Sequence, residues 1–143
     1  MKTKFSGKKK VNNKIVIKRY QDMRVAFNLS FLTNDRKYNF NSSKCTKELK
    51  ANLLDKMTNL SSQDKMNVLI RGKRGGIERI ENPSKLKLRV HNVFKKTRQN
   101  DCDNAYWVFR FASGKCRVMG MFNDNIFYVL GIDYDFSLYD HGS

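Results

Sequence analysis

The sequence has few of the features that would place it in a membrane or in an oxidising compartment. No apolar run approaches the roughly 20 residues of a membrane-spanning helix, and the basic N-terminus lacks the apolar stretch of a secretory signal. The three cysteines, Cys45, Cys102 and Cys116, are widely spaced, with no Cys-x-x-Cys and no paired histidine. These absences predict a cytoplasmic protein without a disulfide framework, a zinc site or a cofactor.

Acidic residues are also scarce relative to basic ones. The 143 residues include 29 Lys and Arg against 13 Asp and Glu, a formal net charge of +16. Residues 1–100 hold 26 basic and 7 acidic residues, a net +19, whereas residues 101–143 hold 3 and 6, a net −3. Such a charge favours nucleic acid or the ribosome as partner over a membrane surface. The alternative is a chain that is basic throughout because it is rich in Lys and Asn.

The chain is long enough for one domain with one core, preceded by a basic arm. Residues 1–19 contain eight Lys or Arg and no acid. This composition is typical of a flexible arm that contacts phosphates without reading sequence, or of a solvated tail. Residues 20–143 are predicted to form the domain.

The first half of the domain is predicted to contain one strand and two helices. Apolar and polar residues alternate over 24–32, as in a half-buried strand. Apolar residues then recur every three or four positions over 44–60, which predicts an amphipathic helix. Ser61 and Asp64 form a candidate capping box for a second helix, which Gly72 would end. We expect these helices to form a hairpin, followed by a basic loop, RGKRGG, at 71–76.

The second half is predicted to be a run of antiparallel strands. Residues 85–93, KLKLRVHNV, place Lys85, Lys87, Arg89 and His91 on one face, which meets either an anion or solvent. A polar loop at 94–104 precedes strands at 106–112, 116–122 and 125–133, whose short turns impose antiparallel pairing. The last strand is apolar on both faces and should lie inside the sheet.

The predicted fold is therefore α+β. A two-helix hairpin would cover one face of a twisted antiparallel sheet of four to five strands. The other face would carry the basic residues.

Two segments carry a resemblance to a known family. The C-terminal stretch WVFRFASGKCRVMGMFNDNIFYVLGIDYDFSLY, residues 107–139, has an aromatic-Arg-aromatic strand, a strand that starts with Arg, a short turn, an apolar strand, an Asp and a late Tyr. It resembles the end of proteins in the RelE/HigB/ParE toxin superfamily, in particular the RelE-like members of phages and mobile elements. Residues 76–94, GIERIENPSKLKLRVHNVF, are similar to the middle strand of the same proteins. The likeness extends over about residues 20–140.

The resemblance implies the toxin of a toxin–antitoxin system, a metal-free mRNA endoribonuclease that acts in the ribosomal A site and inhibits translation. Attack of a ribose 2′-OH on the adjacent phosphate needs a base, an acid and cations. Carried over by position, Arg117 would stabilise the phosphate and Tyr139 would transfer a proton or stack on a base. Arg89 and His91 would join them on the middle strand, with His91 as acid or base. An acidic antitoxin would be the protein partner.

Further basic residues are candidates for nucleic-acid binding rather than for chemistry. The apolar hairpin formed by the predicted strands at 116–122 and 125–133 would give the site a rigid base, and the polar residues at its two ends would form the site itself. The candidates are Lys85, Lys87, Arg110, Lys73, Arg74, Lys95, Lys96 and Arg98.

The sequence departs from the family at residues 133–140, DYDFSLYD, where many family nucleases carry an Arg or Lys. Asp133 and Asp135 would oppose an RNA phosphate, supply a base, or pair with Arg117 and Arg110. One alternative is a non-catalytic protein of this fold that binds nucleic acid, the ribosome or a host protein. Another is a relative whose basic face mainly binds an antitoxin. A nuclease requires its catalytic side chains to converge on one phosphate, whereas a binding module needs only a broad positive surface.

Overall fold

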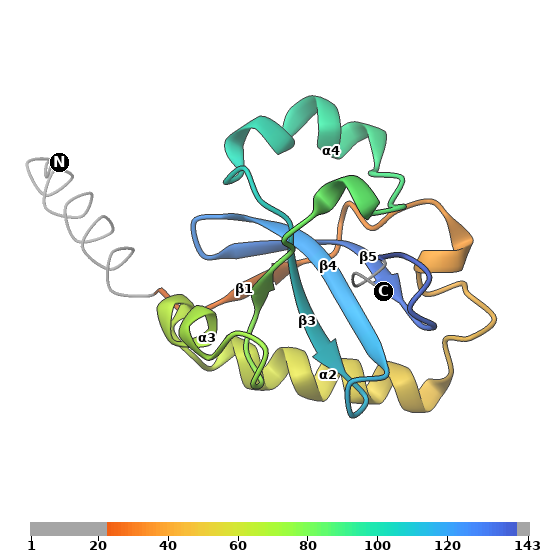
Figure 1. Cartoon of the computed structure of the whole chain (residues 1–143), viewed down its shortest axis with the longest axis horizontal. Helices are drawn as coiled ribbons and strands as arrows, with labels where there is room; N and C mark the ends of the chain where they lie inside the picture. Colours follow the sequence, from red (N-terminus) through yellow and green to blue (C-terminus); the bar gives the residue numbers. More distant parts are fainter. Residues whose placement is uncertain (1–22, 140–143) are drawn as a thin grey trace, which may run out of the picture.

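The computed structural model describes residues 23–139, in which a β-sheet is covered on both faces (Figure 1). The predicted α+β class is confirmed, and the predicted arm at 1–19 lies outside the described residues. The strands are β1 (Ala26–Asn28), β2 (Glu78–Arg79), β3 (Trp107–Phe111), β4 (Cys116–Asn123) and β5 (Ile126–Asp133). The helices are α2 (Lys47–Ser61), α3 (Lys65–Arg71) and α4 (Asn92–Thr97), and the 3-10 turns are η1 (Arg36–Tyr38), η2 (Pro83–Lys85) and η3 (Gln99–Asp101).

The strands form one sheet in the order β1-β5-β4-β3-β2. The three C-terminal strands lie within one or two residues of their predicted bounds and pair antiparallel, as their short turns require. The prediction that the last strand lies inside the sheet is also confirmed, because β5 is flanked by β1 and β4. Its apolar side chains are buried on both faces for this reason.

The prediction of a wholly antiparallel sheet is wrong at β1. This strand pairs parallel with β5, with Ala26 opposite Ile126 and Asn28 opposite Tyr128. A long connection separates these two strands in the chain, so no turn dictates their relative direction. β1 is also shorter than the predicted 24–32, and β2 was not predicted because two residues give no alternation.

Both predicted helices in the first half exist, and each begins at a side-chain cap. Thr46 accepts a hydrogen bond from the Leu49 N–H at the start of α2, and Asp64 accepts one from the Met66 N–H at the start of α3. Ser61 is the last residue of α2, so the predicted capping box is reduced to Asp64. Gly72, at a φ of 50°, ends α3 as predicted.

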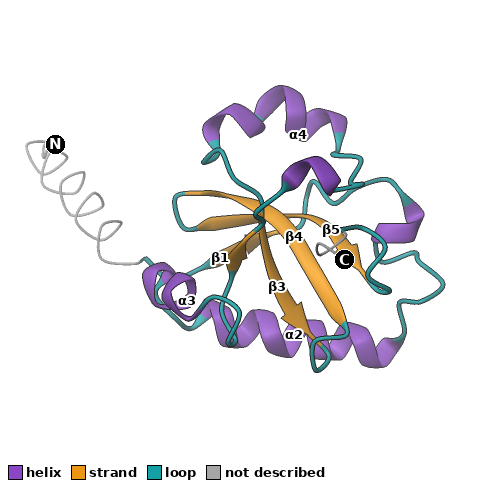
Figure 2. Cartoon of the chain, viewed as in Figure 1, coloured by secondary structure: helices purple, strands orange, loops and turns teal. Residues whose placement is uncertain are grey.

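The two helices do not form the expected antiparallel hairpin. In Figure 2, α2 lies lengthwise across the view and α3 is seen nearly along its axis. Leu53 and Leu60 of α2 and Val68 of α3 are buried against one face of the sheet. Phe109, Phe122 and Phe127 meet them there.

The opposite face of the sheet was predicted to be open and basic, and this is wrong. Figure 2 shows α4 on the side of the sheet away from α2. Phe94 of α4 is fully buried against Tyr128 and Leu130, and the segment 86–90 packs across the same face. The sheet is therefore the middle of three layers, and the basic side chains of residues 85–98 lie on the outer layer rather than on a strand of the sheet.

Residues 85–93 are correspondingly not a strand of the sheet. η2 ends at Lys85, only Leu86 forms a β-bridge, with Tyr139, and His91 accepts from the Val93 N–H to start α4. The predicted loop at 94–104 contains most of α4 and all of η3. The alternation itself is real, since Leu86, Leu88 and Val90 are half-buried whereas Lys85, Lys87 and Arg89 are exposed.

Candidate nucleic-acid interface

One end of the sheet carries four charged residues side by side on the face away from α2, which we call the charged row. The strand register places Arg110 of β3 opposite Arg117 of β4, and Arg117 opposite Asp133 of β5. Glu78 of β2 completes the row, with its Oε1 3.4 Å from Arg110 Nη2. The expected pairing of an acid with Arg110 therefore occurs, but with Glu78 in place of Asp133 or Asp135.

Arg117 is unusually enclosed for a guanidinium group. Arg117 is only 6% exposed, and the centroid of the Phe136 ring lies 4.3 Å from Arg117 Cζ. Two of its buried nitrogens, Nε and Nη1, make no hydrogen bond, and the same holds for Arg110 Nε. Burial and the nearby Arg110 lower the pKa of Arg117, while Asp133 and Glu78 act in the opposite direction.

Asp133 is bound to the backbone of the segment that follows it. Its carboxylate accepts hydrogen bonds from the N–H groups of Ser137 at 3.1 Å, Leu138 at 3.2 Å and Asp135 at 3.3 Å. Burial raises the pKa of Asp133, and these three hydrogen bonds partly offset that rise. Asp133 thus organises the C-terminal segment.

Tyr139 is a neighbour of Arg117. It is 6% exposed, forms the bridge with Leu86, and its phenol raises the pKa of Arg117 electrostatically. Both residues are consequently part of the folded core, as well as being neighbours.

Arg89 and His91 lie in a different place from Arg117 and Tyr139. Arg89 pairs with Asp35 at 3.3 Å, and the His91 ring packs on Phe31, which in turn contacts Tyr128. Tyr128 is paired with Met121, four residues along β4 from Arg117, a separation of roughly 13 Å. The contacts of Arg89 and His91 are thus with Asp35 and Phe31, and convergence of the four predicted catalytic residues on one phosphate, which requires donors within about 3 Å, stays a prediction.

The predicted binding residues are also divided. Lys73 and Arg74 lie in the turn between α3 and β2, where Gly75 adopts a φ of 95° and its carbonyl accepts from Arg71 and Lys56. In Figure 1 this turn follows α3, well away from α4. Arg110 is half-buried in the charged row.

The remaining five predicted binding residues lie together with Arg89, which was predicted to be catalytic, on a surface that we call the basic strip. Its six cations are all exposed and belong to the segment and helix that cover the sheet opposite α2. No Asp or Glu occurs between residues 85 and 98. The strip consists of Lys85, Lys87, Arg89, Lys95, Lys96 and Arg98.

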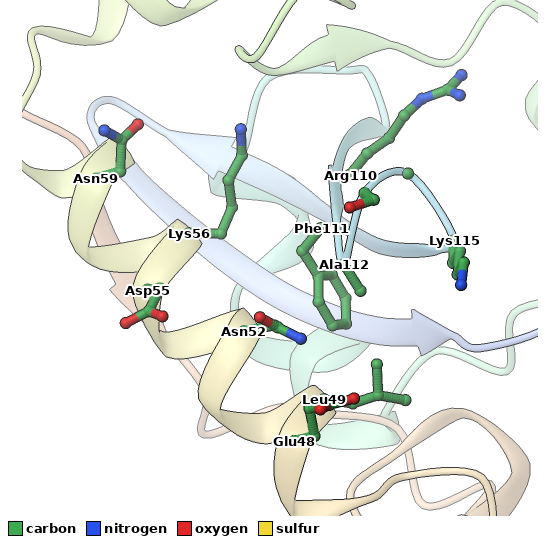
Figure 3. A pocket seen from close by; sticks show the side chains of 12 residues that line it. Glu48, Leu49, Asn52, Asp55, Lys56, Asn59, Arg110, Phe111, Ala112 and Lys115 are labelled. Atoms are coloured by element: carbon green, nitrogen blue, oxygen red, sulfur yellow. The ribbon is translucent and has the colours of Figure 1, made fainter.

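A cleft of about 230 Å³ is lined by Asp35, Arg89 and His91. Two further clefts lie near these features. The larger of the two, of about 700 Å³, lies between α2 and the β3–β4 turn (Figure 3). Its polar residues carry charges of both signs, among them Glu48, Asp55, Lys56 and Lys115, and Arg110 points away from it. A smaller cleft of about 330 Å³ lies between η2 and η3 and is lined by Gln99, Asn104 and Tyr106. Neither cleft was predicted, because amides and one Tyr in loops have no periodic pattern.

The pairing of Lys44 with Asp135 gives a prediction for acid stability. Hydrogen bonds from Lys44 and then Ser137 lower the pKa of Asp135 from 3.8 to about 2. Because this pKa is depressed by folding, the stabilisation is present above pH 4 and is lost between about pH 4 and pH 2. Asp135→Asn should flatten this acid limb and cost about 1 kcal/mol or less at neutral pH, since the pair is partly exposed.

Thermal unfolding followed from pH 2 to pH 7 measures this effect. Lys44→Gln is the matched variant, because it removes the first-named partner of Asp135 and should flatten the same limb in part. Parallel losses of Tm in wild type and Asp135→Asn below pH 4 would contradict the assignment.

Comparisons of the chain with protein-family models, with curated proteins and with solved structures gave no match. Among the described residues, no helix is both long enough and apolar enough to cross a membrane. A functional conclusion therefore rests on the residues of this chain alone.

Proposed function

We propose that the protein binds single-stranded RNA through the basic strip. The observation that carries this proposal is the exposure of six cations on one outer layer, without an acid in the same stretch of chain. The only ion pair recorded for these six side chains within residues 23–139 joins Arg89 to Asp35. Arg98 also donates to the Thr97 carbonyl and lies over the Phe31 ring, and the four lysines of the strip are the cations most open to phosphates.

The shape of the strip supports a single-stranded partner. Lys87 and Arg89 alternate with Leu88 along the segment that follows η2, so their side chains emerge roughly 6.6 Å apart, and Lys85 ends η2 just before them. This spacing suits a backbone whose phosphates follow one another along a flexible strand. Lys and Arg bind such a strand mainly through phosphate contacts and counterion release, without reading its sequence.

Cleavage of RNA is the second candidate, and the charged row favours it. The unpaired nitrogens of Arg117 and Arg110 are donors that a phosphorane would require, and Tyr139 is close to Arg117. Binding is the better-supported function because Arg89 and His91 lie elsewhere and Phe136 covers Arg117. The ribosomal A site as target and an acidic antitoxin as partner stay predictions.

Neutralising the strip should weaken RNA binding and reduce its salt dependence. For Lys85→Gln/Lys87→Gln, the slope of log K against log salt should fall in magnitude by about 1.4, since each single-strand phosphate contact contributes about 0.7. Affinity near 0.1 M salt should fall roughly ten- to thirtyfold. Fluorescence anisotropy with a labelled RNA of roughly 12 nucleotides, titrated from about 50 to 200 mM salt, measures both quantities.

The control is Lys47→Gln/Lys50→Gln, which removes two exposed lysines from α2, a helix on the other face of the sheet. It should retain the wild-type slope. Equal losses in the two double variants would show that net charge alone binds RNA and would overturn the strip as the site. Gel analysis of the same samples, without and with added ribosomes, decides the second candidate: intact RNA in both supports binding, and cleavage abolished by Arg117→Ala supports the nuclease.

A further inference from the structure

We propose that the 330 Å³ cleft between η2 and η3 holds one unstacked base of the bound RNA and prefers bases with an exocyclic amino group over uracil. This inference rests on the proposed function, because the strand that supplies the base would be the one on the basic strip. It adds base selection to a surface that by itself contacts only phosphates.

The cleft is placed where such a base would arrive. Pro83, the first residue of η2, and Gln99, the first residue of η3, both line it. Lys85 ends η2 and Arg98 immediately precedes Gln99, so the two ends of the basic strip border the cleft. A strand that follows the strip therefore passes the opening of the cleft.

The walls of the cleft suit the faces of a base. Ile80 and Met121 are almost fully buried beneath it, and Tyr106 is half-buried at its side. Apolar and aromatic side chains provide sequence-tolerant contact with the π-face of any base. A cleft of about 330 Å³ is at the lower end of the range for ligand sites, which fits one base better than two stacked ones.

The polar groups of the cleft suit the edge of a base. Gln99 and Asn104 each present an amide with both donors and an acceptor. Within residues 23–139, no recorded hydrogen bond engages either side-chain amide. Both amides are therefore available to the Watson–Crick edge of a base that has left its stack.

Glu81 supplies the preference among bases. Its exposed carboxylate lines the cleft and accepts hydrogen bonds but donates none. Adenine, cytosine and guanine each offer an exocyclic NH₂ as donor, whereas uracil offers carbonyl oxygens at the corresponding positions. Arg79 also lines the cleft, and its exposed guanidinium meets the phosphate of the unstacked nucleotide, as the other cations of this surface do. The carboxylate of Glu81 then faces those oxygens and disfavours uracil.

Anisotropy titrations with oligonucleotides of adenine, cytosine or uracil of one length test the inference at fixed salt. Wild type should bind the adenine or cytosine strand about fivefold or more tightly than the uracil strand. Gln99→Ala/Asn104→Ala should remove this preference and leave the salt slope unchanged, since no charge is altered. Glu81→Gln, at an exposed position, should also reduce the preference without affecting folding.

The matched control is Asn52→Ala/Asn59→Ala, which removes two amides from the larger cleft on α2 (Figure 3). It should keep both the preference and the slope. Equal binding of all three strands by wild type, or a preference that survives both Gln99→Ala/Asn104→Ala and Glu81→Gln, would overturn the base site while the strip remains. If wild type shows no salt-dependent binding to any of the strands, the proposed function is overturned, and the base site with it.

Discussion

Replacing Asp133 with alanine is expected to lower the free energy of unfolding by about 3–5 kcal/mol. Asp133 is 1% exposed and accepts three backbone hydrogen bonds from residues 135–138. Without the carboxylate, the N–H groups of Ser137 and Leu138 lose an acceptor inside the protein. Arg117 also loses a nearby negative charge that supports its ionised form.

Asp133→Asn separates these two contributions. The amide keeps one oxygen that can accept from the backbone but removes the charge, so its cost should be about half that of the alanine variant. Urea unfolding followed by the fluorescence of Trp107 gives both values. An alanine variant within about 1 kcal/mol of wild type would show that the C-terminal segment is held by its apolar contacts instead.

The same residue shows what sequence reasoning could and could not reach. From the sequence alone, Asp133 could oppose a phosphate, supply a base or pair with an arginine. The structure places it beside Arg117 in the strand register, yet its hydrogen bonds go to the backbone. Which side chains lie opposite each other on neighbouring strands follows from the strand register. Hydrogen bonds from a side chain to the nearby backbone depend on how the chain turns after the strand, and the alternation of apolar residues does not predict that turn.

The C-terminal strands were predictable because local signals agree with the final fold. Short turns at 112–115 and 124–125 leave antiparallel pairing as the only option, and residues 126–132 are apolar enough to require burial on both sides. No comparable constraint acts on β1, whose neighbour in the sheet comes a hundred residues later in the chain. Its parallel pairing is a property of the assembled domain.

The segment 85–91 shows the opposite case. The predicted alternation of buried and exposed side chains is present, but the segment is not the strand that this alternation predicted. Alternation reports that every second side chain is buried, and Leu86 and Leu88 are indeed turned toward the sheet. It does not report whether the backbone hydrogen-bonds to a neighbouring strand. Here the segment crosses the face of the sheet, so its cations reach solvent together with those of α4.

This difference decides the functional conclusion. Basic side chains on a strand would have pointed at Arg117 across a concave face, as a nuclease needs. On a covering layer they form an exposed strip, while Arg117 lies beneath Phe136. The candidate residues were therefore identified from the sequence, but their division between a surface and a core required the third layer of the fold.

The arrangement of the charged row depends on one irregularity in β4 and β5. The strand register shifts between Met119 and Gly120, which leaves Leu130 without a partner on β4. Beyond this bulge, Gly131 faces Leu88 and Asp133 shares a face with Arg117. Without the bulge, regular pairing of the same residues would place Leu130 opposite Met119 and turn Asp133 toward α2, since neighbouring side chains on a strand alternate between faces.

Gly120→Ala is therefore expected to cost about 3 kcal/mol or more and to disturb the charged row. A Cβ at this position would lie 1.9 Å from the Tyr128 carbonyl oxygen and 2.8 Å from the Phe127 ring, and backbone at a bulge between two central strands has no room to yield.

Gly75→Ala is the control, because nothing lies within 4 Å of a Cβ there and only the φ of 95° opposes it. Urea unfolding should separate the two variants by about 1–2 kcal/mol. If Gly120→Ala unfolds with the wild-type midpoint, the bulge is not fixed by steric contact. Asp133 would then owe its place beside Arg117 to its own hydrogen bonds.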